Sequence, residues 1–406
     1  MIIDVAIIGA GPYGLAAAAH LHSNRLFVRI FGEPMASWKH NMTEDMLLKS
    51  APWASTISDP NREFTIKRYF EDRDLPYHDS NIAVPRQIFV EYGEAYQRRY
   101  VPAVERKQVV SVVPSNGGSF VTLDDGERFY ARNVIVAVGM TPFQYMPSYT
   151  HGISPDLVSH AGEYGPVDHL RGKRVLVVGA GSSAIDLAAL LYDKGIDVSI
   201  VARSKQLVFG MIRERSLWQR MVAPDSGIGE GWRFMAAVNT PWLIHMLPAS
   251  ARLGFAYTKI LGALGGPFMR DRVEGKIPVF LDREISIQHV SDSHVTVHLR
   301  NQSQREDITA DHVVFATGYQ IDVNKLPFFK QNTTRCIRTV ESINAPALSQ
   351  NYESSVAGLY FIGPAAAPSF GPVCRFVHGT GYPARRLQRH VQRSVKQLGT
   401  AQEAEI

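Results

Sequence analysis

The sequence predicts an α/β fold with two Rossmann-like dinucleotide-binding domains, the second of which carries a helical insertion. Two glycine fingerprints are the main observation: Gly9-Ala-Gly11-Pro-Tyr-Gly14 near the N-terminus and Gly179-Ala-Gly181-Ser-Ser-Ala184 near the middle of the chain. Each follows an apolar run and precedes a helix-like run, which is the context in which this pattern indicates a nucleotide site. The 406 residues are enough for two or three domains.

The first half of the chain begins with a near-continuous apolar run over residues 2–8, as expected of a strand buried in a parallel sheet. A helix over 15–21 and a strand over 26–31 complete the first unit. Further along, the pattern predicts a helix over 85–100 and strands over 109–113, 120–123 and 129–138, separated by Asn-Gly-Gly and Asp-Asp-Gly turns.

The second βαβ unit is predicted over residues 174–178, 182–194 and 197–201. An aromatic-rich, helical insertion follows over 206–275. Strands resume over 278–281, 285–289, 295–299 and 313–318, and the chain closes with a strand over 358–363 and a helix from about 373 to 398. We expect a discontinuous FAD-binding domain, 1–160 with 320–406, and an NADP-binding domain over 161–319.

Composition excludes several function classes. With 45% apolar and 20% charged residues and a net charge of +5, the chain is typical of a globular protein without a nucleic-acid-binding arm. Cys336 and Cys374 form no CxxC motif, and the histidines show no metal-binding spacing, so neither a dithiol centre nor a metal site is predicted. We find no secretion signal and no membrane-spanning segment, so the cytoplasm is the expected location.

The first fingerprint has a separate role for each glycine. Gly9 permits a tight turn, Gly11 lets the backbone approach a pyrophosphate, and Gly14 allows close helix packing, while the helix N-terminus attracts phosphates. The acidic residue that would hold the ribose is displaced, because Gly32 ends the second strand and Glu33 follows it. Glu33 is the candidate ribose ligand, with weaker adenosine binding as the alternative.

The second fingerprint ends in Ala184, and its second strand leads into Arg203 and Lys205 instead of a carboxylate. An arginine at this place pairs with a 2′-phosphate, which favours NADPH over NADH. The alternative is that both side chains only solvate a loop.

A family resemblance rests on the two fingerprints together with three other segments: the linker Ser159-His160-Ala-Gly-Glu-Tyr164, the strand end Ala316-Thr317-Gly318-Tyr319, and Gly358-Leu-Tyr-Phe-Ile-Gly363. Together they resemble the flavin-containing and N-hydroxylating monooxygenases, with Baeyer-Villiger monooxygenases as near relatives. The spacing of Gly152 and the aromatic Tyr164 around His160 depart from the Baeyer-Villiger signature.

The resemblance implies FAD and NADPH as cofactors. The expected cofactor-binding residues are Gly9, Gly11, Pro12, Gly14, Glu33, Trp38, Gly139, Gly179, Gly181, Ser182, Ser183, Ala184, Arg203, Lys205, Thr317, Gly318, Gly363, Gly371 and Pro372. Three further candidates are implied near the chemistry. Lys49 would contact substrate or nucleotide, His160 would shape nicotinamide movement at the domain junction, and Arg375 would stabilise negative charge on the reduced flavin beside a helix N-terminus.

The implied activity is a monooxygenase of the kind found in secondary metabolism. NADPH would reduce FAD, O2 would form a C4a-(hydro)peroxyflavin, and one oxygen atom would enter a small, partly apolar substrate, most readily at nitrogen or sulfur. The alternatives are Baeyer-Villiger oxidation of a ketone, an NAD(P)H:acceptor flavin oxidoreductase without oxygen insertion, and a non-catalytic dinucleotide sensor.

The insertion over 206–275 is expected to form a lid or wall over the substrate channel. An oligomer face and a membrane-touching surface are the alternatives, because Met235 to Ala251 contains no charged residue. A homodimer is the first oligomer to test, since dimers are common among soluble enzymes.

Overall fold

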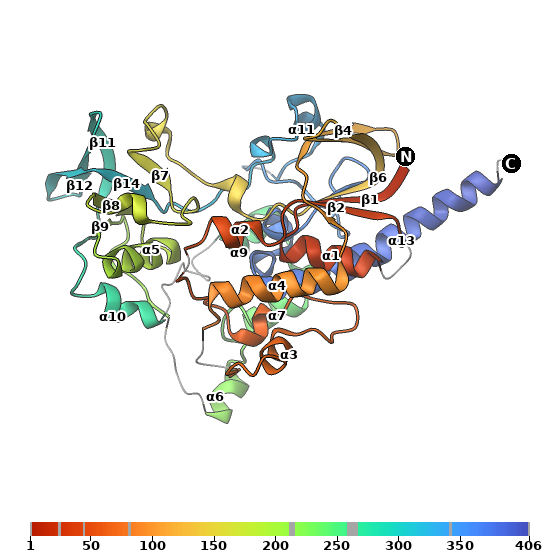
Figure 1. Ribbon diagram of the computed structural model, residues 1–406, viewed down its shortest axis with the longest axis horizontal. Coiled ribbons are helices and arrows are strands. Elements are labelled where there is room, and N and C mark those ends of the chain that lie inside the picture. Colours follow the sequence, from red (N-terminus) through yellow and green to blue (C-terminus); the bar gives the residue numbers. More distant parts are fainter. Residues whose placement is uncertain are drawn as a thin grey trace.

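The computed structural model describes residues 2–22, 26–43, 45–79, 83–210, 216–257, 267–340 and 343–404. Figure 1 shows two lobes, each built around a sheet with parallel strands and flanked by helices. The predicted α/β fold with two Rossmann-like units is confirmed.

The larger lobe contains the first fingerprint. Its sheet has the order β3-β2-β1-β6-β5-β4, and a further strand, β15, also pairs with β6. Its strands are β1 (Ile2–Ile8), β2 (Val28–Phe31), β3 (Val104–Glu105), β4 (Val109–Ser115), β5 (Gly118–Leu123), β6 (Arg128–Val136) and β15 (Leu359–Phe361). Because β1 runs parallel to β2 and β6, and β15 runs parallel to β6, the carboxyl ends of these strands lie at one edge of the sheet.

The helices of this lobe are α1 (Pro12–His22), α2 (Ala36–His40), α3 (Ile66–Glu71), α4 (Arg86–Tyr100), α11 (Gln331–Cys336), α12 (Ala367–Phe370) and α13 (Gly381–Ala404). The small side chains from Ala16 to Ala19 are all buried in α1. They let α1 pack closely against α13, whose far end extends away from the body of the molecule (Figure 1).

The smaller lobe contains the second fingerprint. Its parallel sheet has the order β10-β9-β8-β14-β7, and a separate antiparallel sheet has the order β11-β12-β13. The elements are β7 (Val158–His160), β8 (Arg174–Val178), α5 (Ser182–Asp193), β9 (Asp197–Val201), α10 (Arg270–Val273), β10 (Val279–Phe280), β11 (Glu284–Val290), β12 (Val295–Arg300), β13 (Arg305–Ala310) and β14 (His312–Phe315).

The expected insertion leaves the smaller lobe after β9 but packs on the larger one. Its helices are α6 (Leu217–Val222), α7 (Trp232–Asn239), α8 (Pro241–His245) and α9 (Ala249–Tyr257), while 211–215 and 258–266 lie outside the described residues. Both α8 and α9 contact α12. The ring of His245 hydrogen-bonds the Leu348 carbonyl oxygen at 2.8 Å, so a segment that is continuous with the second unit is anchored on the first.

Two of the differences between the expected and the observed secondary structure have a clear physical reason. The C-terminal helix begins at Gly381 instead of Val373, because the chain first makes short 3-10 turns after Gly371, which has a φ of +85°. The strand β13 was not expected, since its largely exposed, charged sequence lacks an apolar alternation. The 3-10 turns cover Pro52–Ser55, Thr141–Phe143, Ser148–Thr150, Asp168–Leu170, Pro267–Met269, Val323–Lys325, Gly363–Ala366, Pro372–Arg375 and Val377–Thr380.

Within the described ranges, no helix combines the length and the apolar character that a bilayer crossing requires.

Candidate functional site

A cavity of about 650 Å³ lies where the two lobes meet. The first sheet contributes residues that follow its strands, including Gly9 after β1, Gly32 after β2 and Ala137 after β6. The second sheet contributes Ala161 after β7 and Tyr319 after β14. The carboxyl ends of the parallel strands in both sheets therefore face one space, which is where open α/β sheets bind their ligands.

The first fingerprint forms one end of this cavity. A Cβ atom added at Gly9, which has a φ of +108°, would lie 2.5 Å from the Ala137 carbonyl oxygen, and one at Gly14 would lie 1.9 Å from the Gly9 oxygen. Strand and helix thus approach more closely than any side chain permits. A Cβ at Gly11 meets no heavy atom within 4 Å. Because Gly11 lines the cavity, its backbone is open to a pyrophosphate, and the orphan N–H groups of α1 begin beside it.

Glu33 lies on the cavity wall one residue after Gly32. Its carboxylate accepts hydrogen bonds from Lys39 Nζ at 3.1 Å and from His40 Nε2 at 2.8 Å. Partial burial acts to raise the pKa of Glu33, but the hydrogen bonds from His40 and Lys39 outweigh it and hold this pKa below its usual value. Glu33 is therefore a fixed, ionised acceptor near the place where a ribose would lie.

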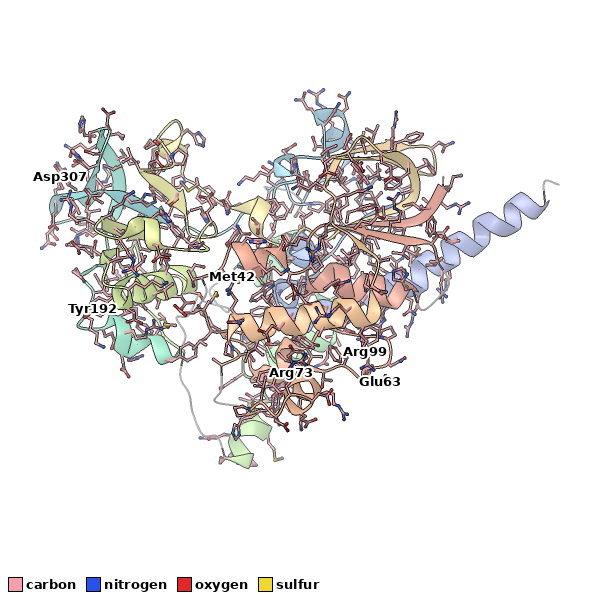
Figure 2. All side chains as sticks on the ribbon, in the orientation of Figure 1. Met42, Glu63, Arg73, Arg99, Tyr192 and Asp307 are labelled. Atoms are coloured by element: carbon pink, nitrogen blue, oxygen red, sulfur yellow. The ribbon has the colours of Figure 1, made fainter. Side chains whose placement is uncertain are left out.

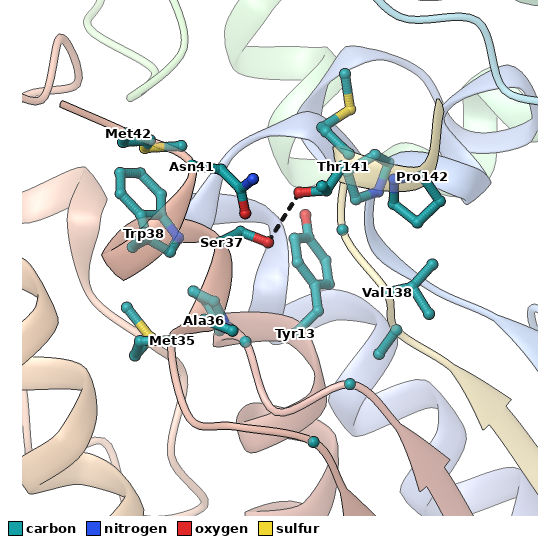
Figure 3. A pocket seen from close by; sticks show the side chains of 18 of the residues that line it. Tyr13, Met35, Ala36, Ser37, Trp38, Asn41, Met42, Val138, Thr141 and Pro142 are labelled. Atoms are coloured by element: carbon teal, nitrogen blue, oxygen red, sulfur yellow. Dashed lines mark hydrogen bonds between the residues drawn. The ribbon is translucent and has the colours of Figure 1, made fainter. Parts of the chain in front are cut away.

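The middle of the cavity is walled by α2 and the segment that follows β6. Ser37 and Thr141 share a hydrogen bond of 3.0 Å between their hydroxyl oxygens, and Asn41 points toward the same space (Figure 3). Trp38 packs edge-on against Phe89, with 4.6 Å between ring centroids. Met42 lies at the junction of the two lobes in Figure 2. This part of the wall offers apolar surface together with a few hydroxyl and amide groups.

The second fingerprint has the same local geometry as the first. Gly179 has a φ of +145°, and a Cβ there would lie 2.6 Å from the Ala316 carbonyl oxygen. Gly181 caps α5, Ser182 and Ser183 form its first turn, and Ala184 is fully buried beneath it. Ser183 lines the cavity, so the N-terminal part of α5 and the first fingerprint border the same space.

Arg203 and Lys205 lie in the turn after β9, and both are exposed. The side chain of Tyr149 lies near Arg203. Burial raises the pKa of the Tyr149 phenol, and the charge of Arg203 partly offsets that effect. Both cationic side chains are thus accessible at the carboxyl end of β9, where a Rossmann-like unit meets the adenosine ribose.

Lys49 forms an ion pair with Asp186 of α5, with 2.5 Å between Nζ and Oδ2. Lys49 belongs to the loop that follows α2 in the larger lobe, so this contact joins the two lobes. Burial lowers the pKa of the Lys49 amino group, and the charge of Asp186 partly offsets that effect. Asp186 lines the cavity, whereas Lys49 is not among the residues of its wall.

His160 is buried and has both ring nitrogens engaged by the backbone. The Gly162 N–H donates to Nδ1 at 3.0 Å, so Nε2 carries the proton and donates to the Gly318 carbonyl oxygen at 3.0 Å. Burial also lowers the pKa of His160, which favours this neutral form. The ring therefore joins the segment after β7 to the segment after β14. The Thr317 hydroxyl in the latter segment also donates a hydrogen bond to the Tyr145 carbonyl oxygen.

The C-terminal segment closes the cavity beside Tyr13, whose hydroxyl donates to the Phe376 carbonyl oxygen at 2.9 Å. A Cβ at Gly363, which has a φ of +70°, would lie 3.2 Å from the Tyr13 ring. One at Gly371 would lie 2.7 Å from Ile244 of α8, so Gly371 accommodates the insertion. Pro372 begins the 3-10 turn that ends at Arg375, an exposed residue on the cavity wall.

The structure brings some of the expected site residues onto the cavity wall. These are Gly9, Gly11, Pro12, Glu33, Trp38, Gly139, Ser183 and Arg375. Among the described residues, the following expected site residues are not part of that wall: Gly14, Lys49, His160, Gly179, Gly181, Ser182, Ala184, Arg203, Lys205, Thr317, Gly318, Gly363, Gly371 and Pro372.

Sequence reasoning missed a substantial part of the wall. The missed residues are Ile8, Ala10, Tyr13, Phe31, Met35, Ala36, Ser37, Asn41, Met42, Thr43, Met46, Lys107, Gln108, Val109, Ala137, Val138, Met140, Thr141, Pro142, Ala161, Tyr164, Asp186, Leu187, Tyr319, Pro364, Phe376 and Val377. Their position after strand ends was an available signal for Met140 to Pro142, whereas residues 35–46 carry no comparable pattern.

None of the described residues between 206 and 275 lines the cavity, and the lid expected from the insertion stays a prediction. Trp218 and Trp232 are 71% and 65% exposed on the outer surface of this segment. In the described part of the chain, no cluster of His, Cys, Asp or Glu side chains is arranged to hold a metal.

Comparisons with known proteins agree with this geometry. Residues 6–218 match the family described as pyridine nucleotide-disulphide oxidoreductase. The indole-3-pyruvate monooxygenase YUCCA1 of Oryza sativa subsp. japonica is 30% identical over 347 residues, 78% of this chain and 77% of that protein. The probable indole-3-pyruvate monooxygenase YUCCA9 of Arabidopsis thaliana is 28% identical over 363 residues, 80% of this chain and 78% of its own.

Among solved structures, an ornithine N-hydroxylase from Kutzneria sp. 744 superposes with a TM-score of 0.75 at 16% identity, covering 97% of this chain and 100% of that one. At this identity the superposition shows a shared fold. The family match over residues 6–218 and the 30% identical relative also show membership of a family. The chain belongs to the pyridine nucleotide-disulphide oxidoreductase family and to the flavin-dependent monooxygenase superfamily.

Proposed function

We propose that this protein is an FAD-dependent, NADPH-consuming monooxygenase that inserts one oxygen atom from O2 into a small, partly apolar organic substrate. The observation that carries the proposal is the single cavity bordered by both fingerprints, with Gly11 on one side and Ser183 on the other. A flavin and a nicotinamide bound at the two helix N-termini would share this space, as hydride transfer between them requires.

The chain's own residues would hold FAD at the first fingerprint. Gly9 and Gly14 keep strand and helix close, Gly11 leaves room for the pyrophosphate, and Glu33 accepts from ribose hydroxyls. When bound, FAD supplies the hydride-accepting and oxygen-activating chemistry. Trp38 and Met42 would present apolar surface on the wall and limit the access of water to a bound flavin.

NADPH would bind at the second fingerprint, with its pyrophosphate at Ser182 and Ser183 and its 2′-phosphate near Arg203 and Lys205. The exposure of both cations at the end of β9 supports this preference. Arg203→Ala is expected to raise the KM for NADPH about tenfold while changing the KM for NADH less than twofold, because one charge-assisted phosphate contact contributes roughly 1.5 kcal/mol. Equal losses with both nucleotides would contradict the role of Arg203.

Oxygen insertion at nitrogen or sulfur is the preferred reaction. The relatives named above act on indole-3-pyruvate and ornithine according to their names, so a test panel should contain both, with cadaverine, a thioether and a cyclic ketone. Product labelled from ¹⁸O2 with one of these substrates would support the proposal. NADPH oxidation that yields only hydrogen peroxide or a reduced quinone, with no labelled product across the panel, would favour a reductase.

The two cysteines give no support to a dithiol reductase. Cys374 is buried, and burial raises the pKa of its thiol to about 12, while Cys336 is exposed at the end of α11. The proposed division into an FAD-binding part, 1–160 with 320–406, and an NADP-binding part, 161–319, needs one change at its first boundary. The pairing of β7 with β14 favours a first boundary just before Val158.

A further inference from the structure

Four methionines line the cavity: Met35, Met42, Met46 and Met140. Met35 is fully buried, and a Cβ atom added at Gly93 would lie 2.5 Å from its Sδ atom, so this sulfur is packed against α4. The other three residues, which we call the cavity methionines, are half-buried. A thioether sulfur is soft, and two-electron oxidants convert it to a sulfoxide. The cavity methionines are therefore open to an oxidant that forms inside the cavity.

Local backbone contacts hold two of the cavity methionines at the wall. The Met46 N–H donates to the Thr43 carbonyl oxygen at 3.2 Å, and the Met46 carbonyl oxygen accepts from the Arg86 N–H at 2.9 Å. The Met140 carbonyl oxygen accepts from the Phe143 N–H at 2.8 Å, at the start of a 3-10 turn. Both methionines are thus fixed parts of the wall.

The third cavity methionine, Met42, lies on the side of the cavity that a flavin ring would face. Glu33 marks the adenosine end and Gly11 the pyrophosphate, so the ring of a bound FAD would extend beyond Gly11. Hydride transfer requires the ring to face the second fingerprint, where Ser183 borders the same space. Met42 lies at the junction of the two lobes in Figure 2 and on the wall drawn in Figure 3.

We propose that the cavity methionines are a self-oxygenation site, at which the protein oxidises its own thioethers to sulfoxides when no organic substrate occupies the cavity. The inference rests on the proposed function and deepens it, because it names a thioether as a sulfur nucleophile that the site oxygenates. A sulfoxide is polar, so its formation replaces part of the apolar wall by a polar group.

The step balances with the cofactor of the proposed function. Reduced FAD supplies two electrons and two hydrogens, and the thioether sulfur supplies two further electrons to O2. The O–O bond breaks, one oxygen atom forms the S–O bond of the sulfoxide, and the other leaves as water with the two hydrogens. FAD and methionine sulfoxide remain, and no other oxidant is consumed.

The test uses the FAD-loaded protein without organic substrate, in the presence of catalase, which removes hydrogen peroxide that reaches the bulk solution. The flavin is reduced anaerobically with a single equivalent of dithionite and then mixed with buffer that contains ¹⁸O2, and this cycle is repeated. Peptide mass spectrometry measures the sulfoxide fraction and the ¹⁸O content at each methionine. A parallel series uses NADPH as the reductant.

The matched controls are Met221 and Met246, each 66% exposed on the insertion and absent from the cavity wall. Added hydrogen peroxide without reductant should oxidise these two before the cavity methionines, because they are the more accessible. Flavin reoxidation should reverse the order, with at least one cavity methionine carrying ¹⁸O-labelled sulfoxide about fivefold or more above both controls. Met35 should stay reduced in both experiments, because its sulfur is packed against α4.

A reoxidised flavin with no cavity methionine above the two controls would overturn the inference and leave the proposed function untouched. Sulfoxide without ¹⁸O would also overturn it, because the oxygen atom would have another source. Labelled sulfoxide with dithionite but no flavin reduction by NADPH would support the inference and contradict the NADPH part of the proposed function. A protein that does not bind FAD would overturn both.

Discussion

The geometry of the first fingerprint predicts different consequences for two glycine-to-alanine substitutions, Gly14→Ala and Gly11→Ala. In Gly14→Ala the new Cβ would lie 1.9 Å from the Gly9 carbonyl oxygen, so α1 must move away from β1. Overpacking of this kind costs about 1–3 kcal/mol, a large part of the 5–15 kcal/mol that stabilises a typical domain. In Gly11→Ala the new methyl group meets no protein atom within 4 Å and projects into the cavity.

We therefore expect Gly14→Ala to lower the thermal midpoint of the protein by several degrees, at roughly 2–4 °C per kcal/mol. Gly11→Ala should fold with a stability within about 1 kcal/mol of the wild type when FAD is absent. Its affinity for FAD should fall about 10- to 100-fold, because the methyl group occupies the space that a pyrophosphate needs.

Thermal unfolding of the apoproteins and FAD titration followed by flavin fluorescence would measure both effects. The decisive result is the separation of the two properties, in which Gly14→Ala loses stability and Gly11→Ala loses affinity. If Gly11→Ala bound FAD as tightly as the wild type, the pyrophosphate would not lie against Gly11, and the assignment of this end of the cavity would be refuted.

Three further predictions concern titrating groups. His160→Phe should lower the free energy of unfolding by about 1–3 kcal/mol, because the Gly318 carbonyl oxygen loses its donor. Since burial lowers the pKa of His160, the wild type should also lose stability as the pH falls below about 6.5. Urea unfolding of the variant should lack that part of the pH dependence. Hydrogen bonds from Arg29 and Lys107 lower the pKa of Glu127 to about 2, so the thermal midpoint of Glu127→Gln should lie below that of the wild type at pH 7 and converge with it as the pH falls from 4.5 toward 2. A constant gap between the two midpoints would contradict this reasoning. With a disulfide reagent, Cys336 should react in the native protein and Cys374 only after unfolding, so two reactive thiols per native chain would contradict the burial of Cys374.

The parts of the fold that the sequence predicts well are those determined by local patterns. The strands at 174–178 and 197–201 have the expected bounds, because strands buried on both faces of a parallel sheet read as short apolar runs. The edge strand β13 lacks such a run. The C-terminal helix starts later than expected, because Gly371 and Pro372 set a series of tight turns that periodicity does not reveal.

The residues of the candidate site also include some that local sequence patterns predict and others that they do not. Glycines that need an unusual backbone conformation or a close approach, such as Gly9 and Gly179, can be predicted from the sequence motif. The partner of Lys49 cannot, because Asp186 is distant in sequence and only the packing of two lobes brings it near. The role expected of Lys49 as a direct contact rested on resemblance, and it stays a prediction.

The pairing of β15 with β6 has a consequence for the order in which the protein folds during synthesis. Val136 at the end of β6 pairs with Phe361 of β15, and more than half of the chain separates the two strands. The smaller lobe, whose parallel strands lie between residues 158 and 315, is translated in full before β15 emerges. Since non-local pairings form late and leave strand edges exposed meanwhile, we expect the edge of β6 from Val134 to Val136 to stay unpaired in the nascent larger lobe until the last part of translation. A polypeptide released before residue 359 would lack that strand and the helix α13 that covers α1.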